Sequence, residues 1–293
     1  MDTPFYSVSE VGRDVWQLTD VLLGKSYLVC GQGRALLVDA GCGFGNIREV
    51  VETLTDLPVT VAFTHGHYDH VAGGCWFEEA LIAAEDERLV SLAYEHAFRV
   101  LPQVISEGLV TQDTPFGPRD GRRCRLAFLS DKDVFDLGGR TVRVVGLRGH
   151  TQGSLGYLVE DERLLLSGDA VTPIMCLFFN ESCDIEGWAQ TLEAMDALEF
   201  DHFMTGHHDR VFKKSDLASF MDAARFAQQD RGVYYQHARL DEYRGVMHFC
   251  PCKVDDADSP DFRAVIERWH ELVPRKSKGR RARKRGAAKA RDV

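Results

Sequence analysis

Four side chains that commonly bind metal ions lie within six residues, in the segment His-Gly-His-Tyr-Asp-His that begins at residue 65. They directly follow an apolar run, residues 59–63, that predicts a buried strand. In extended backbone, residues two positions apart point to the same side, so His65 and His67 can reach one metal ion. Asp69 and His70 come after the turn and can reach another ion. The spacing therefore predicts a two-metal site at a strand end.

Three more predicted strands end in a histidine or a carboxylate. His150 follows a strand over 141–147, Asp169 follows one over 164–167, and His207 follows one over 202–204. A turn histidine or a capping aspartate would explain any single case. It does not explain four strand ends together, so the seven metal-ligand candidates are His65, His67, Asp69, His70, His150, Asp169 and His207.

Imidazole and carboxylate donors suit zinc, and iron and manganese accept similar ligands. We expect two zinc ions, with iron or manganese as the alternatives. A metal ion that keeps an open position lowers the pKa of a bound water from about 15.7 to about 7, which makes that water a nucleophile. The chemistry predicted is metal-dependent hydrolysis without a serine or cysteine nucleophile.

Other side chains beside the ligands are candidates for catalysis and substrate binding. Asp69 and Asp169 are the catalytic carboxylates, and Tyr68 either donates a hydrogen bond to a developing oxyanion or packs in the core. Residues 171–188 are rich in large apolar side chains, which either pack under a helix or line the substrate. The substrate-lining candidates from this segment are Met175, Phe178 and Phe179. The long connection 105–125 is typical of a lid.

The elements that must position these residues alternate between strand and helix. Short β-rich runs at 15–18, 27–30 and 35–38 precede a helix marked by Ile47, Val50, Val51 and Leu54. Beyond residue 212, two further apolar patterns indicate helices, the first over 217–227 and the second at Val265, Ile266, Trp269 and Leu272. We expect a catalytic domain at 1–212 and a mainly helical extension at 213–274, with some strand at 246–249. The extension either covers the site or forms a homodimer interface.

Composition and charge narrow the class of protein. The 293 residues are 44 % apolar, enough for a large buried core. The absence of a basic and apolar leader or of a long uncharged apolar run predicts neither secretion nor membrane insertion. The eight cysteines are scattered rather than densely spaced, which favours a reducing cytoplasm.

Basic residues concentrate at the C-terminal end. Ten of the 35 lysines and arginines, but one of the 45 acids, lie in 275–293, so residues 1–274 carry a formal charge of −19. The tail lacks the apolar side chains needed for packing and is predicted to be disordered. It is either simply solvated or makes weak contacts with RNA, anionic lipid or another acidic surface. The acidic body would repel phosphates, so we expect a small-molecule substrate rather than nucleic acid.

At these residues the sequence resembles the metallo-β-lactamase superfamily, over roughly residues 8–212. The resemblance rests on segments 64–70, 149–154, 167–170 and 206–207, in the family's order, and on the strand and acidic turn at 36–41. It implies an α/β fold, an αββα four-layer sandwich of two mixed sheets between helical layers, with the metals at one edge.

The resemblance also implies how the ligands divide. His65, His67 and His150 would hold one ion; Asp69, His70 and His207 would hold the other; and Asp169 would bridge them. Asp39 resembles the acid that orients a ligand in this family, and Thr64 and Ser154 are candidates for the same role.

Some positions depart from the family pattern or select among its members. Leu147-Arg148 stands where Thr-Pro is common, so Arg148 either braces its loop or presents a charge to an anionic substrate. His207 is followed by His208, and the spacing from Gly206 favours His207 as the ligand. Diiron flavoprotein relatives usually carry glutamate in place of His67, which disfavours that chemistry.

The sequence thus predicts a hydrolase that cleaves an ester, thioester, lactone or amide-type bond of a small molecule. The alternative is an oxidoreductase similar to the persulfide dioxygenases of the family, which use a single iron. The substrate itself is not encoded in any motif recognised here.

Overall fold

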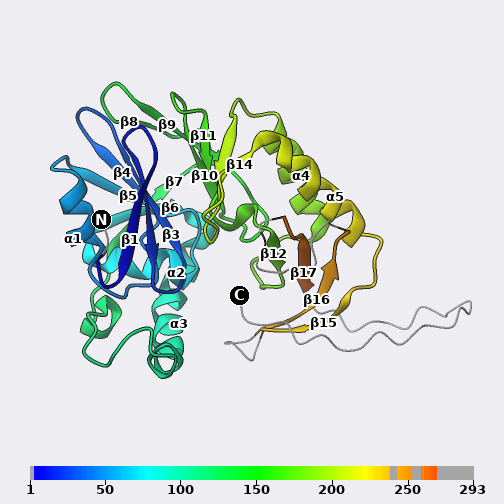
Figure 1. Ribbon diagram of the computed structural model, residues 1–293, viewed down its shortest axis with the longest axis horizontal. Helices are drawn as coiled ribbons and strands as arrows, with labels where there is room; N and C mark the ends of the chain where they lie inside the picture. Colours follow the sequence, from blue (N-terminus) through cyan, green and yellow to red (C-terminus); the bar gives the residue numbers. More distant parts are fainter. Residues whose placement is uncertain (1–2, 238–242, 252–258, 260, 269–293) are drawn as a thin grey trace, which may run out of the picture.

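Two β-sheets face each other at the centre of the computed structural model, which describes residues 3–237, 243–251, 259 and 261–268 (Figure 1). The first sheet has seven strands in chain order: β1 (Tyr6–Gly12), β2 (Val15–Asp20), β3 (Lys25–Cys30), β4 (Ala35–Val38), β5 (Val59–Ala62), β6 (Glu79–Ala83) and β7 (Arg125–Leu129). Its strands are antiparallel from β1 to β4 and parallel from β4 to β7. The strands predicted at 15–18, 27–30, 35–38 and 59–63 are therefore confirmed as β2 to β5.

The second sheet has six strands. In spatial order they are β14 (Phe212–Lys213), β13 (His202–Met204), β11 (Leu164–Leu166), β10 (Leu155–Val159), β9 (Thr141–Gly146) and β8 (Val134–Asp136). The β11–β13 pair is parallel, while the other pairs are antiparallel. This parallel pair brings the C-terminal ends of β11 and β13 to the same edge of the sheet.

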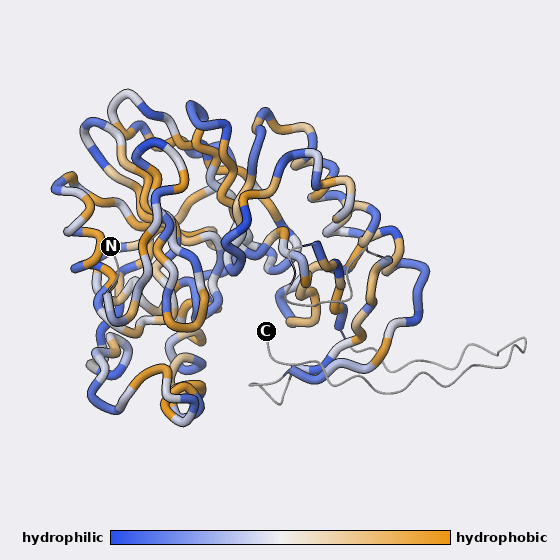
Figure 2. The backbone as a smooth tube through the Cα atoms, in the orientation of Figure 1, coloured by the Kyte–Doolittle hydropathy of each residue, from blue (hydrophilic) through white to orange (hydrophobic). Residues whose placement is uncertain are grey.

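Helices cover the outer faces of both sheets. On the first sheet lie α1 (Ile47–Leu54), α2 (Tyr68–Val71) and α3 (Glu87–Ser106), and on the second lie α4 (Ile185–Asp196) and α5 (Leu217–Ala227) (Figure 1). Strand β4 shows why the layers form: Ala35 and Leu37 pack toward the helices, whereas Leu36 and Val38 pack toward the other sheet. The αββα sandwich is thus confirmed. Hydrophobic residues recur along its central strands (Figure 2).

A third sheet occupies much of the C-terminal extension. Its strands are β12 (Ile174–Leu177), β17 (Ala264–Arg268), β16 (Arg244–Phe249) and β15 (Val233–Gln236), in that spatial order. The helix expected over 217–227 is confirmed as α5. The second expected helix is wrong for Val265 and Ile266, which lie in β17, because pairing with β12 and β16 outweighs a short apolar pattern. Trp269, Leu272 and the tail 275–293 lie outside the described residues.

The expected 105–125 connection is shorter than predicted, because α3 continues to Ser106 and a 3₁₀ turn forms at Gly117–Asp120. Phe116 stacks on Phe44 with ring centroids 4.7 Å apart, so part of the segment is packed against the body. None of the helices in the described part of the chain has the length and apolar character needed to cross a bilayer.

Candidate metal centre

The seven predicted ligands converge where four strand ends meet. Four of them follow β5, and the others follow β9, β11 and β13. Their donor atoms form overlapping groups, within each of which all atoms lie within 4.8 Å of one another. These groups are His65/His67/His150, His65/His70/Asp169 and Asp69/His70/His207.

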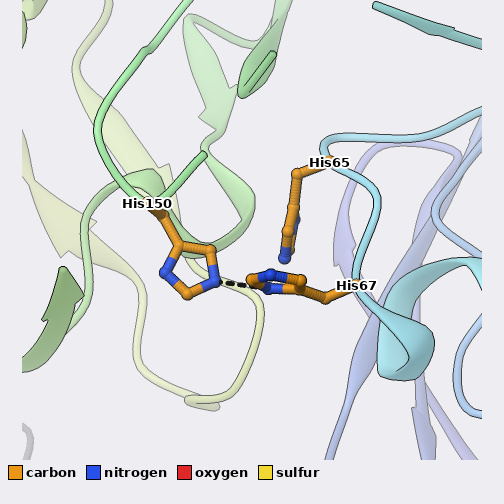
Figure 3. Close-up of side chains that lie close together, drawn as sticks. All are labelled: His65, His67 and His150. Carbon is orange, nitrogen blue, oxygen red and sulfur yellow. Dashed lines mark hydrogen bonds between the residues drawn. The ribbon is translucent and has the colours of Figure 1, made fainter. Parts of the chain in front are cut away.

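The first group, which we call the three-histidine group, comprises His65, His67 and His150 (Figure 3). The Nδ1 atom of His67 lies 2.8 Å from Nε2 of His150. The ring of His65 stands at 4.8 Å, centroid to centroid, from each of the other two rings. All three rings therefore present nitrogen atoms to one small volume.

The second group comprises Asp69, His70 and His207, and Asp169 lies between the two groups. Nε2 of His207 is 3.5 Å from Asp69 Oδ2 and 3.2 Å from Asp169 Oδ2. The same Asp169 oxygen is 3.7 Å from Nε2 of His150. Asp169 thus reaches toward both groups, as a bridging ligand would.

Several donor atoms in this centre fit a bound metal because they are buried without a hydrogen-bond partner among the described residues. Nε2 of His65, Nε2 of His70 and Oδ1 of Asp169 are buried and accept or donate no hydrogen bond within the described part of the chain. Burying such an atom unpaired costs about 1–3 kcal/mol. A side chain at Gly206 would place its Cβ 2.2 Å from Asp169 Oδ1, so the backbone packs tightly around these atoms. The His/Asp cluster is able to bind a metal.

The electrostatics differ between the two groups of donors. Burial lowers the pKa of His65 well below its usual value and that of His150 to about 4, so both imidazoles are neutral at pH 7. Burial raises the pKa of Asp169, but the neighbouring His207 and His70 outweigh it and hold that pKa well below the ordinary range. Burial also lowers the pKa values of His70 and His207, but the carboxylate of Asp169 outweighs it and raises both. His65 and His150 therefore already have the neutral form that coordination requires, whereas a metal ion would compete with a proton for His70 and His207.

A buried aspartate orients two of the histidines. Asp39 Oδ1 accepts the backbone N–H of Thr64 at 2.7 Å, and Oδ2 accepts the Thr64 hydroxyl at 2.8 Å. Oδ2 also lies 2.8 Å from Nδ1 of His70, and the Thr64 oxygen lies 3.0 Å from Nδ1 of His65. Both rings are engaged through Nδ1, which leaves Nε2 for the metal. Asp39 and Thr64 thus lie where the sequence places them.

Ser154 acts one step further from the ligands. Its hydroxyl oxygen accepts the backbone N–H of Thr151 at 3.0 Å and lies 2.8 Å from the Thr151 hydroxyl. It therefore shapes the turn that follows His150 rather than touching a ligand ring.

Two residues that sequence reasoning missed hold the ligand loops. Asp86 accepts hydrogen bonds from the backbone N–H of Gly66 and of Gly153, both at 3.0 Å, and from the Thr151 hydroxyl at 2.7 Å. Glu181 Oε1 lies 2.8 Å from Nε2 of His67. Neither acid belongs to a spacing pattern, because each meets its partners only after the chain has folded.

The substrate-lining candidates differ in position. Phe179 packs against the centre, with ring centroids 4.5 Å from His67 and 5.3 Å from His150. Phe178 is buried behind it at 4.2 Å and joins the core of the third sheet. Met175 is fully buried in the core between the second sheet and its helices. Only Phe179 of the three therefore lies directly on the ligand rings.

The remaining candidates lie at the edge of the centre. Tyr68 begins α2 and is half-buried between two core clusters. Arg148 is exposed, and its guanidinium lies 3.3 Å from Glu85, an arrangement that braces the loop. His208 is not among the clustered donors, whereas His207 is, in agreement with the spacing from Gly206.

Comparisons with known proteins point to one family. The family model described as the metallo-beta-lactamase superfamily matches residues 19–207. The human protein named acyl-coenzyme A thioesterase MBLAC2 is 27 % identical over 203 residues, covering 62 % of this chain and 71 % of its own length. A hydroxyacylglutathione hydrolase of Acidiphilium cryptum is 25 % identical over 232 residues, covering 77 % and 83 % respectively.

Solved structures share the fold. A metallo-beta-lactamase from Pontibacter korlensis superposes with a TM-score of 0.56 at 15 % identity, covering 75 % of this chain and 99 % of its own. A sec-alkylsulfatase from Pseudomonas sp. reaches a TM-score of 0.59 at 15 % identity, covering 76 % of this chain and 42 % of its own. At this identity the likeness concerns architecture alone.

Proposed function

The chain belongs to the metallo-beta-lactamase superfamily, and we propose that it is a two-zinc hydrolase that cleaves the thioester bond of a small acyl thioester. The observation that carries this proposal is the set of converging donors with three buried, unpartnered atoms, on His65, His70 and Asp169. The choice of thioester over ester, lactone or amide is supported by the relatives, whose names describe thioesterases and hydroxyacylglutathione hydrolases.

In this proposal the three-histidine group would hold one zinc ion and the group of Asp69, His70 and His207 would hold the other, with Asp169 within reach of both groups. The ions, when bound, supply Lewis acidity and make water acidic enough to act as a nucleophile near neutral pH. The distances between Asp169 and the rings of His150 and His207 support the shared role of this carboxylate.

The chain's own residues supply positioning and proton transfer. Water attacks the acyl carbon, and the proton that it loses is taken up at the carboxylate of Asp69, which is partly exposed beside His207. The carbon–sulfur bond then breaks, and Asp69 returns this proton to the departing thiolate, so that the thiol is released. Tyr68 donates a hydrogen bond to the developing oxyanion. Phe179 forms the apolar wall against which the acyl group lies, and Phe178 and Met175 back it from the core.

The cysteine content and the acidic charge support a proposed cellular location and a proposed class of substrate. The seven cysteines in the described part of the chain are all free thiols, which supports the proposal of a reducing cytoplasm. A small-molecule substrate fits the acidic body, and a homodimer through the C-terminal extension remains a prediction.

The test is a substrate panel run together with metal analysis. Purified protein is assayed against acyl thioesters, esters, lactones and β-lactams, and its zinc, iron and manganese contents are measured on the same sample. We expect two zinc ions per chain and the highest kcat/KM on a thioester. One iron per chain with oxygen uptake on a persulfide would favour the dioxygenase alternative instead.

The variant His67→Ala removes one ligand and should reduce thioester hydrolysis by several orders of magnitude, because the fold remains while the metal geometry is lost. The control is Glu79→Gln, which alters an exposed ion pair with Arg125 on the first sheet. Near-normal turnover by His67→Ala would contradict the assignment of the site.

A further inference from the structure

The segment 174–183 holds two ligands of the three-histidine group. The carbonyl oxygen of Cys176 lies 2.8 Å from Nδ1 of His150, and the hydroxyl of Ser182 donates to the backbone oxygen of His150 at 2.7 Å. Glu181 reaches His67 from the same segment. This one stretch of chain therefore sets the orientation of both rings.

Glu181 determines which nitrogen of His67 faces the metal. A carboxylate 2.8 Å from Nε2 accepts a hydrogen bond from the N–H at that nitrogen, which leaves the Nδ1 lone pair free. Nδ1 is the atom that points toward His150 in the cluster (Figure 3). The Glu181 side chain is mostly buried, so solvent competes weakly for this hydrogen bond.

Arg268, at the end of β17, fastens the loop that carries Glu181. Its Nη2 donates to the backbone oxygens of Phe179 at 2.5 Å and Asn180 at 2.9 Å, and it lies 3.5 Å from that of Ser182. Strand β17 also pairs with β12, with Ile266 opposite Cys176. The C-terminal sheet thus fixes the segment 174–183 at both ends.

The second group of ligands is supported from elsewhere. His70 is held by Asp39, which follows β4 of the first sheet. The backbone oxygen of Gly206, beside His207, accepts the N–H of Lys25 in β3 at 2.8 Å. The supports of this group that we identify therefore come from the first sheet and not from the C-terminal sheet.

We propose that Glu181 and Arg268 are positioning residues that set the metal affinity of the three-histidine group separately from that of the Asp69/His70/His207 group. Arg268 acts on the loop, and Glu181 acts on His67. The inference rests on the proposed two-metal centre, but it is independent of the substrate.

The test is zinc titration of the full-length apoprotein in competition with a chromophoric chelator. Glu181→Gln should weaken one of the two zinc sites about 10–100-fold and leave the other unchanged, since it removes the charge that orients His67. Arg268→Lys should weaken the same site by a smaller factor, because one ammonium cannot reproduce the fork of the guanidinium. Cobalt substitution should change the absorption spectrum of that site only.

The matched control is Glu267→Gln. Glu267 lies 3.0 Å from Nε2 of His248 in the same C-terminal sheet, so the substitution alters a similar glutamate–histidine contact without approaching a ligand. It should leave both zinc affinities unchanged. Three results would overturn the inference. Glu181→Gln could weaken zinc binding at both sites equally or leave both affinities unchanged. Alternatively, Glu267→Gln could lose as much zinc affinity as Glu181→Gln does.

The inference and the proposed function can fail separately. A wild-type protein that binds no zinc would overturn both. Unchanged zinc binding by Glu181→Gln, beside a wild type that hydrolyses thioesters, would overturn the inference alone. Two zinc sites with the expected asymmetry, but no hydrolysis of any thioester, would overturn the proposed substrate class alone.

Discussion

The candidate metal ligands can be predicted from the sequence because their signal is local. Each lies directly after a strand whose apolar pattern is itself local, and histidine and aspartate at strand ends have a restricted chemistry. The roles of Asp86 and Glu181 are not local. Glu181 meets His67 across 114 positions of sequence, and no spacing rule connects them. Apolar neighbours are equally ambiguous, since Met175 and Phe179 look alike in sequence and differ only in what they pack against.

Asp86 offers a test at this scale, because one carboxylate holds two ligand loops together. Asp86→Ala leaves the backbone N–H groups of Gly66 and Gly153 buried without their acceptor. We expect the free energy of unfolding to fall by about 2–4 kcal/mol, together with a loss of hydrolysis as the loops shift. Urea unfolding followed by circular dichroism measures the first effect, and the thioester assay measures the second.

The neighbouring Glu85 is the control for Asp86. Its exposed carboxylate pairs only loosely with Arg148, at 3.3 Å, so Glu85→Ala should change the free energy of unfolding by less than about 1 kcal/mol. An Asp86→Ala protein as stable as Glu85→Ala would show that Asp86 does not hold the loops.

At the scale of elements, strands with strong local patterns were predicted and elements stabilised by distant partners were not. Strand β4 is short and buried along its whole length, and its uninterrupted apolar sequence predicts a buried strand. Strand β17 is stabilised by pairing with β12, which lies ninety residues earlier in the chain. Its local apolar spacing favours a helix instead. Helix α3 was not predicted, although its buried residues recur at helical spacing from Val90 to Val104.

The two sheets are also joined by a buried arginine. Arg140, just before β9, donates to the carbonyl oxygen of Cys30 in β3 at 2.9 Å and to both carboxylate oxygens of Asp161 at 3.1 Å. Burial raises the pKa of Asp161, but the hydrogen bonds from Arg140 and Arg13 outweigh it and bring that pKa below its usual value.

The pKa shift of Asp161 predicts how its contribution depends on pH. Because the pKa is lower in the folded state, the stabilisation is present above the unfolded value of about 3.9 and is lost as the pH falls through the folded value. Asp161→Asn should lower the free energy of unfolding by about 2–4 kcal/mol at pH 7, since Arg140 loses its main partner. The difference from wild type should shrink below about pH 4.

Urea unfolding at pH 7 and at pH 3.5 checks this prediction. Asp201→Asn is the control, because Asp201 pairs with Arg163 on the surface and should contribute less than about 1 kcal/mol at either pH. If Asp161→Asn lowers the free energy of unfolding equally at pH 7 and at pH 3.5, the charge of Asp161 is not the cause of the stabilisation.

For the whole molecule, the distribution of charge separates the body from the C-terminal tail. Removing residues 275–293 changes the formal charge from −10 to −19 and removes no predicted ligand. The deletion should therefore leave kcat/KM on a small, soluble thioester within about twofold of the full chain, measured at physiological salt where long-range charge effects are screened. A large drop in kcat/KM would instead make the tail part of the site.

The metal centre joins the two halves of the sandwich, since four ligands follow β5 of the first sheet and His150 and His207 follow strands of the second. Under the proposed function, bound ions would cross-link the halves and stabilise only the folded state. At a free concentration 100-fold above Kd, each ion should add about 2.7 kcal/mol to the free energy of unfolding. Chelation should then lower Tm by about 4–5 °C per ion, measured by scanning calorimetry with zinc and with chelator. Restoring zinc should return the transition to its original temperature, and an identical Tm in both conditions would show that no ion links the two sheets.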